Sequence, residues 1–377
     1  MKKTLLAIFL VLGSVILIMW LISPVRPVAW SPDPDNGLTG VYTPNDGLFE
    51  RDSVGIQQQF LVDVGKGPED IVIGEDGYLY TGYDDGRIVR ALVADLLAAY
   101  SNSSITSNAQ NSLSGGIAFE EFANTQGRPL GLRFDAAGNL IVADAVKGIL
   151  SIDKQRNIRV LVDEYEGKKL LFVDHLDIAN DGTIWFSDAS TRFDMLNFVY
   201  DFLEASSTGR LLSYNPTTGE TRLRMDNLFF ANGVAVGPND EFVLINETGK
   251  AKIHRLWLQG DKAGSRDIFI EQLPAMPDNL YFKDGIFWVS LVTLRDPLVE
   301  GLAQNPFLRR LIGGVPKSLL KASSHYGFVI GVTPEGDVIQ NLQSAKGYQS
   351  ITTAIEFQGH LFLGSLDNSS IAVIKID

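Results

Sequence analysis

The chain has 377 residues, of which 45% are hydrophobic and 20% are charged, and it contains no cysteine. This composition is too apolar for intrinsic disorder, and the lack of cysteine excludes disulfides, thiolate metal sites and cysteine nucleophiles. The formal net charge of −13, without a basic stripe, excludes nucleic acid as a natural partner, because a phosphate backbone would repel the protein.

Residues 1–23 have the pattern of a membrane anchor. Lys2 and Lys3 precede an uncharged apolar run from Thr4 to Ile22, and a helix of about 20 apolar residues spans the hydrocarbon core of a bilayer. No small-x-small cleavage site follows, which favours an uncleaved transmembrane helix over a cleaved signal peptide and a secreted protein. The two lysines keep the short N-terminal tail in the cytoplasm. We therefore expect the body of the protein on the periplasmic or extracellular face, joined to the anchor by a proline-rich tether over residues 24–55.

Residues 56–377 repeat one short pattern six times. Each copy has a turn with Gly or Asp, then four or five apolar residues and a small or polar one, and another short strand precedes it. The turns begin at Asp76, Ala137, Asp181, Asn239, Asp284 and Gln358. Paired strands at this period predict an all-β fold, a six-bladed β-propeller. The alternative is a sandwich with coincidental hairpins.

Two stretches depart from the strand pattern. The segment that starts at Asp95 begins as a helix and runs into a polar loop. Residues 295–324 have apolar side chains at helical spacing, which predicts one helical insertion over a face of the propeller. Its apolar stripe could pack on the domain, rest on a membrane or roof a pocket, and packing is the interpretation that we favour.

Oxygen-bearing side chains precede the inner strand of four repeats, in Gly67-Pro68-Glu69-Asp70, Val173-Asp174-His175, Asn232-Gly233 and Pro277-Asp278-Asn279. Because the starts of inner strands meet at one mouth of a propeller channel, these side chains should lie close together. Carboxylate and amide oxygens suit a hard cation such as Ca²⁺, which takes 6–8 oxygen ligands. The sequence has no nucleophile elbow, zinc-protease motif or Walker loop.

Three segments, 126–148, 230–260 and 273–297, closely resemble the strictosidine synthase-like family, and the resemblance runs from about residue 55 to the C-terminus. The wider clan includes the SMP-30/gluconolactonase proteins, the paraoxonases and the diisopropyl fluorophosphatases. The resemblance implies a six-bladed propeller with calcium in its central channel.

The resemblance also implies roles for single residues. Glu69 matches the calcium carboxylate of the first blade, and Asn232 matches the amide of the N-G-V motif. Asp278 matches the acidic residue of P-D-N, a ligand and catalytic carboxylate in hydrolytic relatives, and Asn279 matches the neighbouring amide. Asp174 stands where many relatives carry Asn, so that three carboxylates would face the ion.

Three further residues have two interpretations each. His175, where relatives carry Asp, could transfer protons or pack beside the site and bond a carboxylate. Arg128 could meet an anionic substrate, but a structural role as donor to loops is the simpler interpretation. Glu247, at a strand end, should satisfy backbone donors near the channel.

We expect a membrane-tethered, calcium-dependent hydrolase of esters or lactones, in which the ion polarises a carbonyl and Asp278, or His175, handles the proton. The main alternative is a non-catalytic propeller that binds a ligand or partner and uses calcium structurally. A strictosidine synthase-type condensation of an amine with an aldehyde is a third possibility, and no feature of the sequence indicates an indole amine pocket.

Overall fold

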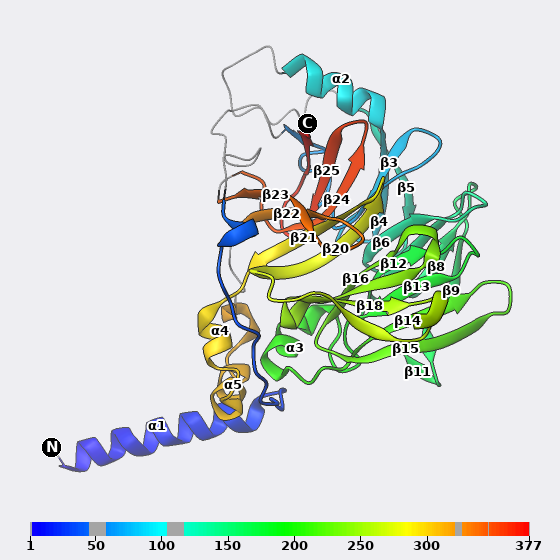
Figure 1. The fold of residues 1–377 in the computed structure, drawn as a ribbon. Coiled ribbons are helices and arrows are strands. Elements are labelled where there is room, and N and C mark those ends of the chain that lie inside the picture. Colours follow the sequence, from blue (N-terminus) through cyan, green and yellow to red (C-terminus); the bar gives the residue numbers. More distant parts are fainter. Residues whose placement is uncertain (1, 45–57, 104–116, 321–325, 346, 377) are drawn as a thin grey trace.

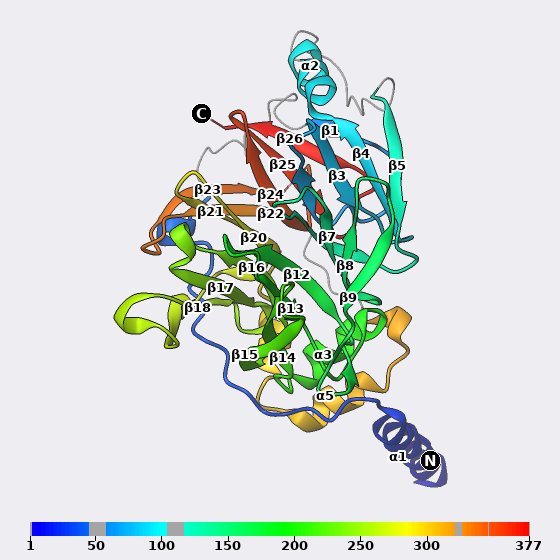
Figure 2. The same cartoon turned by 90° about the vertical axis from the view of Figure 1, so that its right-hand side faces the viewer.

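A computed structural model describes residues 2–44, 58–103, 117–320, 326–345 and 347–376. Six four-stranded antiparallel sheets stand around a common axis (Figures 1 and 2), which confirms the predicted six-bladed propeller. The innermost strands of the blades contact one another in a closed ring, β2–β6–β12–β16–β20–β24 and back to β2.

The first three blades follow the chain without a crossover, and each runs from its inner to its outer strand. Blade 1 contains β2 (Ile71–Ile73), β3 (Tyr78–Gly82), β4 (Arg87–Leu92) and β5 (Phe119–Asn124). Blade 2 contains β6 (Pro129–Phe134), β7 (Leu140–Asp144), β8 (Gly148–Ile152) and β9 (Ile158–Val162). A small hairpin, β10 (Glu164–Tyr165) with β11 (Lys168–Lys169), leads to blade 3, which contains β12 (Val173–Ile178), β13 (Ile184–Asp188), β14 (Gly209–Asn215) and β15 (Glu220–Leu228).

The last three blades include the closure of the ring. Blade 4 contains β16 (Ala231–Val236), β17 (Phe242–Glu247), β18 (Lys252–Trp257) and β19 (Arg266–Ile270). Blade 5 contains β20 (Ala275–Lys283), β21 (Ile286–Leu294), β22 (Gly327–Val332) and β23 (Val338–Ser344). Blade 6 joins both ends of the domain: β24 (Ile351–Phe357), β25 (His360–Ser365) and β26 (Ile371–Lys375) accept β1 (Gln58–Phe60), which pairs antiparallel with β26.

The repeated turns join the first and second strands of each blade. In blade 2 the Asp135 carboxylate accepts the N–H groups of Ala137 and Asn139, at 3.0 and 2.8 Å, while Gly138 takes φ +80°. Such Asx turns need a residue that tolerates positive φ. Asp240 occupies the corresponding position in the fourth copy, at φ 57°. This local chemistry is why the turn sequence marks each blade.

The core lies between neighbouring blades. Aromatic rings of blades 4 and 5 form its largest contact: Phe242 stacks 6.0 Å from Phe287, and Phe269 lies 5.8 Å from the same ring. Phe60 of β1 is fully buried in the cluster that joins blades 6 and 1. Burial at the blade interfaces therefore holds the ring together.

Helices lie at the edges of the propeller. They are α1 (Lys2–Ile22), α2 (Val93–Ser103), α3 (Phe198–Glu204), α4 (Pro297–Gly301) and α5 (Pro306–Gly313), with short 3₁₀ turns η1 (Gly40–Tyr42), η2 (Met195–Asn197), η3 (Pro238–Asp240), η4 (Thr248–Lys250), η5 (Gly260–Lys262) and η6 (Lys317–Leu319). Helices α4 and α5 confirm the predicted insertion, of which residues 321–324 lie outside the described part. Within the described residues, no helix meets the combined length and hydropathy of a membrane-spanning segment.

The proline-rich segment after α1 lies along the propeller. Val25 is fully buried, and the Trp30 ring meets Phe229 edge-on at 5.5 Å. Further along, Lys252 pairs with Asp33 at 2.6 Å, and Gln343 donates to the Tyr42 carbonyl. Residues 23–44 are thus held by side chains of several blades. The rest of the expected tether, residues 45–55, lies outside the described part of the chain.

Candidate metal and active site

The five predicted ligands all lie buried where the inner strands of four blades begin. Glu69 directly precedes β2, Asp174 is in β12, Asn232 in β16, and Asp278 and Asn279 in β20. Asn279 donates from Nδ2 to Glu69 Oε1 at 3.1 Å, across 210 residues of sequence. The fold therefore brings the predicted set to one end of the channel.

Buried acceptor oxygens without a donor distinguish this site. Glu69 Oε2, Asn232 Oδ1, Asn246 Oδ1, Asp278 Oδ1 and Asn279 Oδ1 have no hydrogen-bond partner among the described residues. An unpaired buried polar atom costs about 1–3 kcal/mol, so native structures seldom keep several together without a reason. A cation is the kind of partner that such oxygen acceptors lack, because each of the five can donate a lone pair to it.

Asn246, at the end of β17, was not predicted as part of the set. Its Nδ2 donates to the Asp278 carbonyl, which leaves Oδ1 as the unpaired atom. Gly233 makes the arrangement possible, because a Cβ there would meet the Asp278 carbonyl and would lie 2.8 Å from Asn246 Nδ2. In the pair Asn232-Gly233, the asparagine thus supplies a polar side chain and the glycine allows the inner strands β16 and β20 to approach closely. This pair was recognisable in the sequence, whereas Asn246 was not.

The three carboxyl groups resist ionisation in the absence of a cation. Burial, reinforced by the charges of Asp278 and Asp174, holds the pKa of Glu69 well above its ordinary value. Burial and then the charge of Asp278 raise the pKa of Asp174 in the same way. Burial raises the pKa of Asp278 to about 7, although contacts from Glu69 and Asn232 lower it. The site therefore binds protons in place of a positive ion.

Arg128 stands beside these carboxyl groups as a structural donor. Its Nη1 donates to the Gly67 carbonyl at 2.9 Å, and its backbone N–H donates to Asp144 Oδ1. Its charge lowers the pKa of both Glu69 and Asp174, against the larger effect of burial. The structural interpretation of Arg128 is confirmed, and the guanidinium also offsets part of the negative charge.

Carboxylates at the ends of second strands support the loops that carry the ligands. Glu247 accepts the Phe229 N–H at 2.8 Å, as predicted, and His254 and Lys250 contact the same carboxylate. Asp188 accepts the Phe172 N–H at 3.0 Å in blade 3. Each carboxylate ties a strand end to the segment that precedes a ligand.

His175 lies in the wall behind the unpaired oxygens. It is fully buried, and its Nδ1 lies 2.9 Å from the Val234 nitrogen and 3.1 Å from the Val234 carbonyl oxygen, while Arg133 Nη2 lies 3.4 Å from Nε2. Nε2 lies 3.7 Å from Asp70 Oδ2. Burial lowers the pKa of His175, and the carboxylate of Asp70 opposes that change. The ring therefore joins β12 to β16 and faces Asp70.

Asp70 and Arg133 form a buried ion pair that sequence analysis did not find. Asp70 Oδ2 accepts from Arg133 Nη1 at 3.1 Å and from the Leu132 N–H at 2.8 Å, while Oδ1 accepts from Thr353. The guanidinium also lies over the Tyr281 ring, 5.3 Å from its centroid. Unlike Glu69, Asp70 has donors on both oxygens, so its charge is already matched.

Aromatic side chains form the other wall of the mouth. Phe172, two residues before Asp174, meets Phe230, two residues before Asn232, at 5.4 Å. Phe202 of α3 packs on Phe230 at 4.8 Å. An apolar wall therefore stands next to a cluster of oxygen acceptors, a combination typical of small-molecule sites.

Two family models match the chain: strictosidine synthase over residues 174–261 and strictosidine synthase-like, N-terminal, over residues 40–91. The adipocyte plasma membrane-associated protein of Rattus norvegicus is 32% identical, over 100% of this chain and 99% of its own length. The chain belongs to the strictosidine synthase-like family. Another strictosidine synthase-like protein, number 4 of Arabidopsis thaliana, is 33% identical, over 82% of this chain and 79% of its own length.

Solved structures similar to this strictosidine synthase-like chain include a gluconolactonase from Xanthomonas campestris, with a TM-score of 0.58, 15% identity and coverage of 93% of this chain and 99% of the other. The calcium-binding protein regucalcin of Agrobacterium tumefaciens has a TM-score of 0.56 and 9% identity, with coverage of 85% and 93%. At these identities the similarity establishes the fold alone.

The ligand set of this family member depends on amides. In the part of the chain that the structure describes, no cluster of three or more His, Cys, Asp and Glu side chains is arranged to hold a metal by itself. The unpaired oxygens of Asn232, Asn246 and Asn279 would have to supply the remaining ligands of any metal held here. Hard oxygen atoms of mixed carboxylate and amide type fit Ca²⁺ and not a soft transition metal.

Proposed function

We propose that this protein is a calcium-dependent hydrolase of esters or lactones that is attached to a membrane by α1. The observation that carries the proposal is the group of five unpaired buried oxygens from three blades, next to an apolar wall. The fold similarity to gluconolactonases supports a hydrolytic reaction. Calcium bound there would polarise the substrate carbonyl and stabilise the oxyanion that develops on it.

We assign the proton transfer to Asp278. Its Oδ1 is a buried oxygen acceptor without a partner among the described residues, so a carboxylate there could accept a proton next to the other ligand oxygens. As a carboxylate, Asp278 would accept a proton from the attacking water and then return it to the leaving oxygen. Glu69 and the three amides would hold and orient the ion. Phe172 and Phe230 would exclude water from the apolar part of the substrate.

We assign His175 a positioning role within this proposal. Its Nδ1 is occupied by the Val234 N–H, and its Nε2 faces Asp70 and not the unpaired oxygens. The imidazole fixes β16 and, through it, Asn232.

The decisive experiment measures thermal unfolding of the full chain in detergent, with saturating Ca²⁺ and with chelator. A ligand at about 100 times its Kd adds about 2.7 kcal/mol of stability. We expect a Tm increase of several degrees in wild type and none in Glu69→Ala. Asp144→Asn is the matched control, because Asp144 is also a buried carboxylate at a strand end and lies in blade 2, outside the ligand set. An absent shift in wild type would contradict the calcium site and the mechanism together.

A non-catalytic propeller with structural calcium is the second candidate. It predicts the same calcium shift but no turnover of aryl esters and lactones. Under our proposal the wild type hydrolyses at least one substrate of this panel, and Asp278→Asn abolishes that turnover.

Membrane attachment is a proposal that relatives and helix α1 support. Relatives are named plasma membrane-associated proteins, and the apolar side chains described in α1 from Phe9 onward are largely exposed to solvent in the isolated chain. Lys2 and Lys3 orient the propeller away from the cytoplasm. Extraction of membranes with alkaline carbonate should leave the full chain in the pellet, and its release would contradict the anchor.

A further inference from the structure

We propose that the face formed by η2, α3, α4, α5 and η6, here called the helical face, docks on the lipid bilayer beside α1. The inference rests on the proposed anchor role of α1. It adds a fixed orientation: the propeller would lie with the end that carries the candidate site toward the bilayer.

The helical face exposes the most apolar surface of the body. Outside α1, the three most exposed large hydrophobic residues that the structure describes are Leu298 at 80%, Leu319 at 71% and Leu196 at 69%. They belong to α4, η6 and η2, and Phe307 of α5 adds a ring that is 56% exposed. Isolated exposed apolar residues are normal on any protein, whereas a cluster on one face indicates an interaction surface.

Contacts among these elements bring most of them together. Lys317, which begins η6, donates from Nζ to the Leu196 carbonyl at 2.7 Å and so joins η6 to η2. Arg309 of α5 donates to the Leu203 carbonyl of α3 at 3.2 Å. Helices α4 and α5 lie along the side of the body from which α1 projects (Figure 1).

The helical face is continuous with α1. Arg310 of α5 stacks on the Trp20 ring, 3.8 Å from its centroid, and donates from Nε to the Trp20 carbonyl. The side chains of α1 from Phe9 to Ile18 remain exposed, including Phe9 and Leu17. A helix with apolar side chains on every side needs an apolar environment, and the described residues cover only its C-terminal end, around Trp20. The bilayer is therefore the occupant that fits both α1 and the neighbouring leucines.

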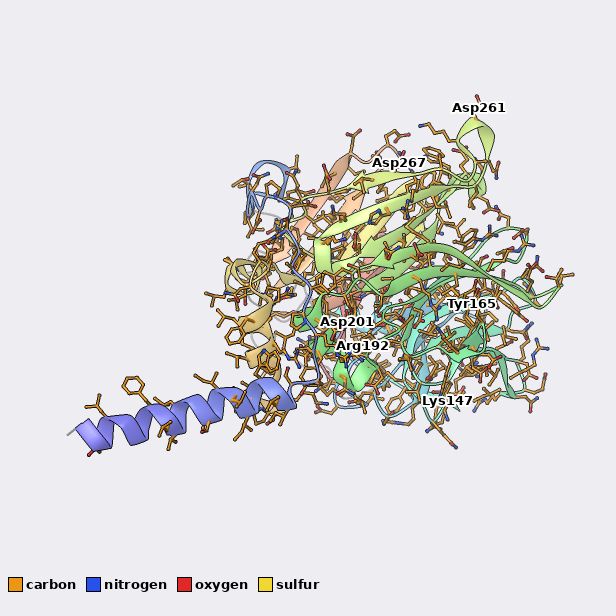
Figure 3. The ribbon with its side chains drawn as sticks, turned by 90° about the horizontal axis from the view of Figure 1, so that it is seen from below. Lys147, Tyr165, Arg192, Asp201, Asp261 and Asp267 are labelled. Carbon is orange, nitrogen blue, oxygen red and sulfur yellow. The ribbon has the colours of Figure 1, made fainter. Side chains whose placement is uncertain are left out.

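The segment after α1, residues 23–30, acts as a rigid strap. Glu204 of α3 accepts the Arg26 N–H at 2.7 Å through Oε2, and its backbone carbonyl accepts the Val28 N–H at 2.8 Å. Arg192 bonds the same carboxylate at 3.0 Å and also donates to the Pro24 carbonyl. Figure 3 shows Arg192, which precedes α3 in the chain, next to Asp201 of α3. A bonded strap, unlike a free tether, transmits the direction of α1 to the body.

The helical face lies at the same end of the propeller as the candidate site. Val173, beside Asp174, pairs with Asp188, where β13 ends and the chain continues to α3. Ala275, at the start of β20, pairs with Leu294, where β21 ends and the chain continues to α4. Docking of the helical face would therefore place the entrance of the site close to the bilayer surface.

The test uses single cysteines, because the chain has none of its own. Full-length variants Leu298→Cys and Leu319→Cys carry an environment-sensitive fluorophore in phosphatidylcholine vesicles, with and without lipids that bear a doxyl quencher. Val160→Cys and Ile339→Cys are the controls, because both side chains are 51% exposed on outer strands of the propeller. Leu12→Cys reports on α1.

We expect at least twofold quenching at positions 12, 298 and 319 and none at 160 and 339. Quenching at position 12 alone would overturn the docked face but not the anchor. No quenching at position 12 would overturn the anchor and this inference together. Lengthening the strap by ten Gly and Ser residues after Ser23 should remove the quenching at 298 and keep it at 12. Neither result depends on enzymatic turnover.

Discussion

Asn279 Nδ2 and Glu69 Oε1 form a 3.1 Å hydrogen bond that joins blade 5 to blade 1 across the channel. Each partner also carries one oxygen without a hydrogen-bond partner: Asn279 Oδ1 and Glu69 Oε2. The bond therefore fixes two ligand oxygens at once and leaves both free to accept a cation. This pairing explains how a site assembled from distant segments can be preorganised before an ion arrives.

The pH dependence of stability should report the calcium-free site. Because burial raises the pKa of Asp278 from 3.8 to about 7, the folded state holds a proton in that interval that the unfolded state has released. Stability with chelator should thus fall as the pH rises from about 4 to about 7, and the raised pKa values of Glu69 and Asp174 act in the same direction. Melting curves at pH 5, 6, 7 and 8 with chelator measure this fall in stability. Asp278→Asn should flatten the curve, and an equally steep curve in this variant would contradict the assignment.

Calcium binding should release protons. Ion binding requires ionised carboxylates, and the pKa values of Glu69, Asp174 and Asp278 are raised in the free site. Calorimetric titrations at pH 6.5 in two buffers of different ionisation enthalpy should give different apparent heats, from which the number of released protons follows. Glu69→Gln should lower that number. Equal heats in both buffers would show that the site is already ionised.

Gly233→Ala should damage the site. The added Cβ would meet the Asp278 carbonyl and lie 2.8 Å from Asn246 Nδ2. We expect a loss of about 1–3 kcal/mol from overpacking, and a calcium-induced Tm shift that is strongly reduced. Gly301→Ala is the control, because a Cβ there has open space. A variant that keeps the full shift would show that the close approach of β16 and β20 is not required.

The buried pair Asp70–Arg133 should matter for folding more than for metal binding. Arg133→Met leaves the buried Asp70 carboxylate without its guanidinium partner. Removal of one partner of a buried ion pair costs about 3–5 kcal/mol, which chemical denaturation can measure. The double variant with Asp70→Asn should recover part of the loss. The control Arg222→Met, in an exposed pair with Glu220, should leave Tm unchanged.

The sequence allowed prediction of the blades because each carries its own local signal. Asp135 and Gly138 define a turn whatever the rest of the chain does, and the apolar residues after it define the second strand. The same logic located Glu69 and Asp278, since each stands immediately before or at the start of an inner strand. These features depend on short stretches of sequence, so they can be recognised one repeat at a time.

Features that depend on distant partners were not predictable. Asn246 gave no signal, because its role arises from the approach of β17 to the Asp278 carbonyl of the next blade. In the sequence Arg133 resembles any other strand residue. Its ion pair with Asp70 of the neighbouring blade becomes apparent only in the structure. The proline-rich composition of residues 24–55 indicates a tether, yet Val25 is buried and Asp33 is paired with Lys252. A proline-rich composition predicts that a segment is stiff and extended, but it does not predict which surface of the protein the segment packs on.

His175→Gln should separate a catalytic from a positioning role. Glutamine keeps an oxygen that can accept the Val234 N–H, but it cannot carry a proton as imidazolium does. Because Nδ1 is engaged and Nε2 faces Asp70 at 3.7 Å, we expect turnover within about tenfold of wild type, with an unchanged pH profile of kcat and a lower Tm. Loss of a true general base costs about 10²–10⁴-fold, the range we expect for Asp278→Asn. A loss of that size in His175→Gln, with one limb of the pH profile removed, would instead make His175 the proton carrier.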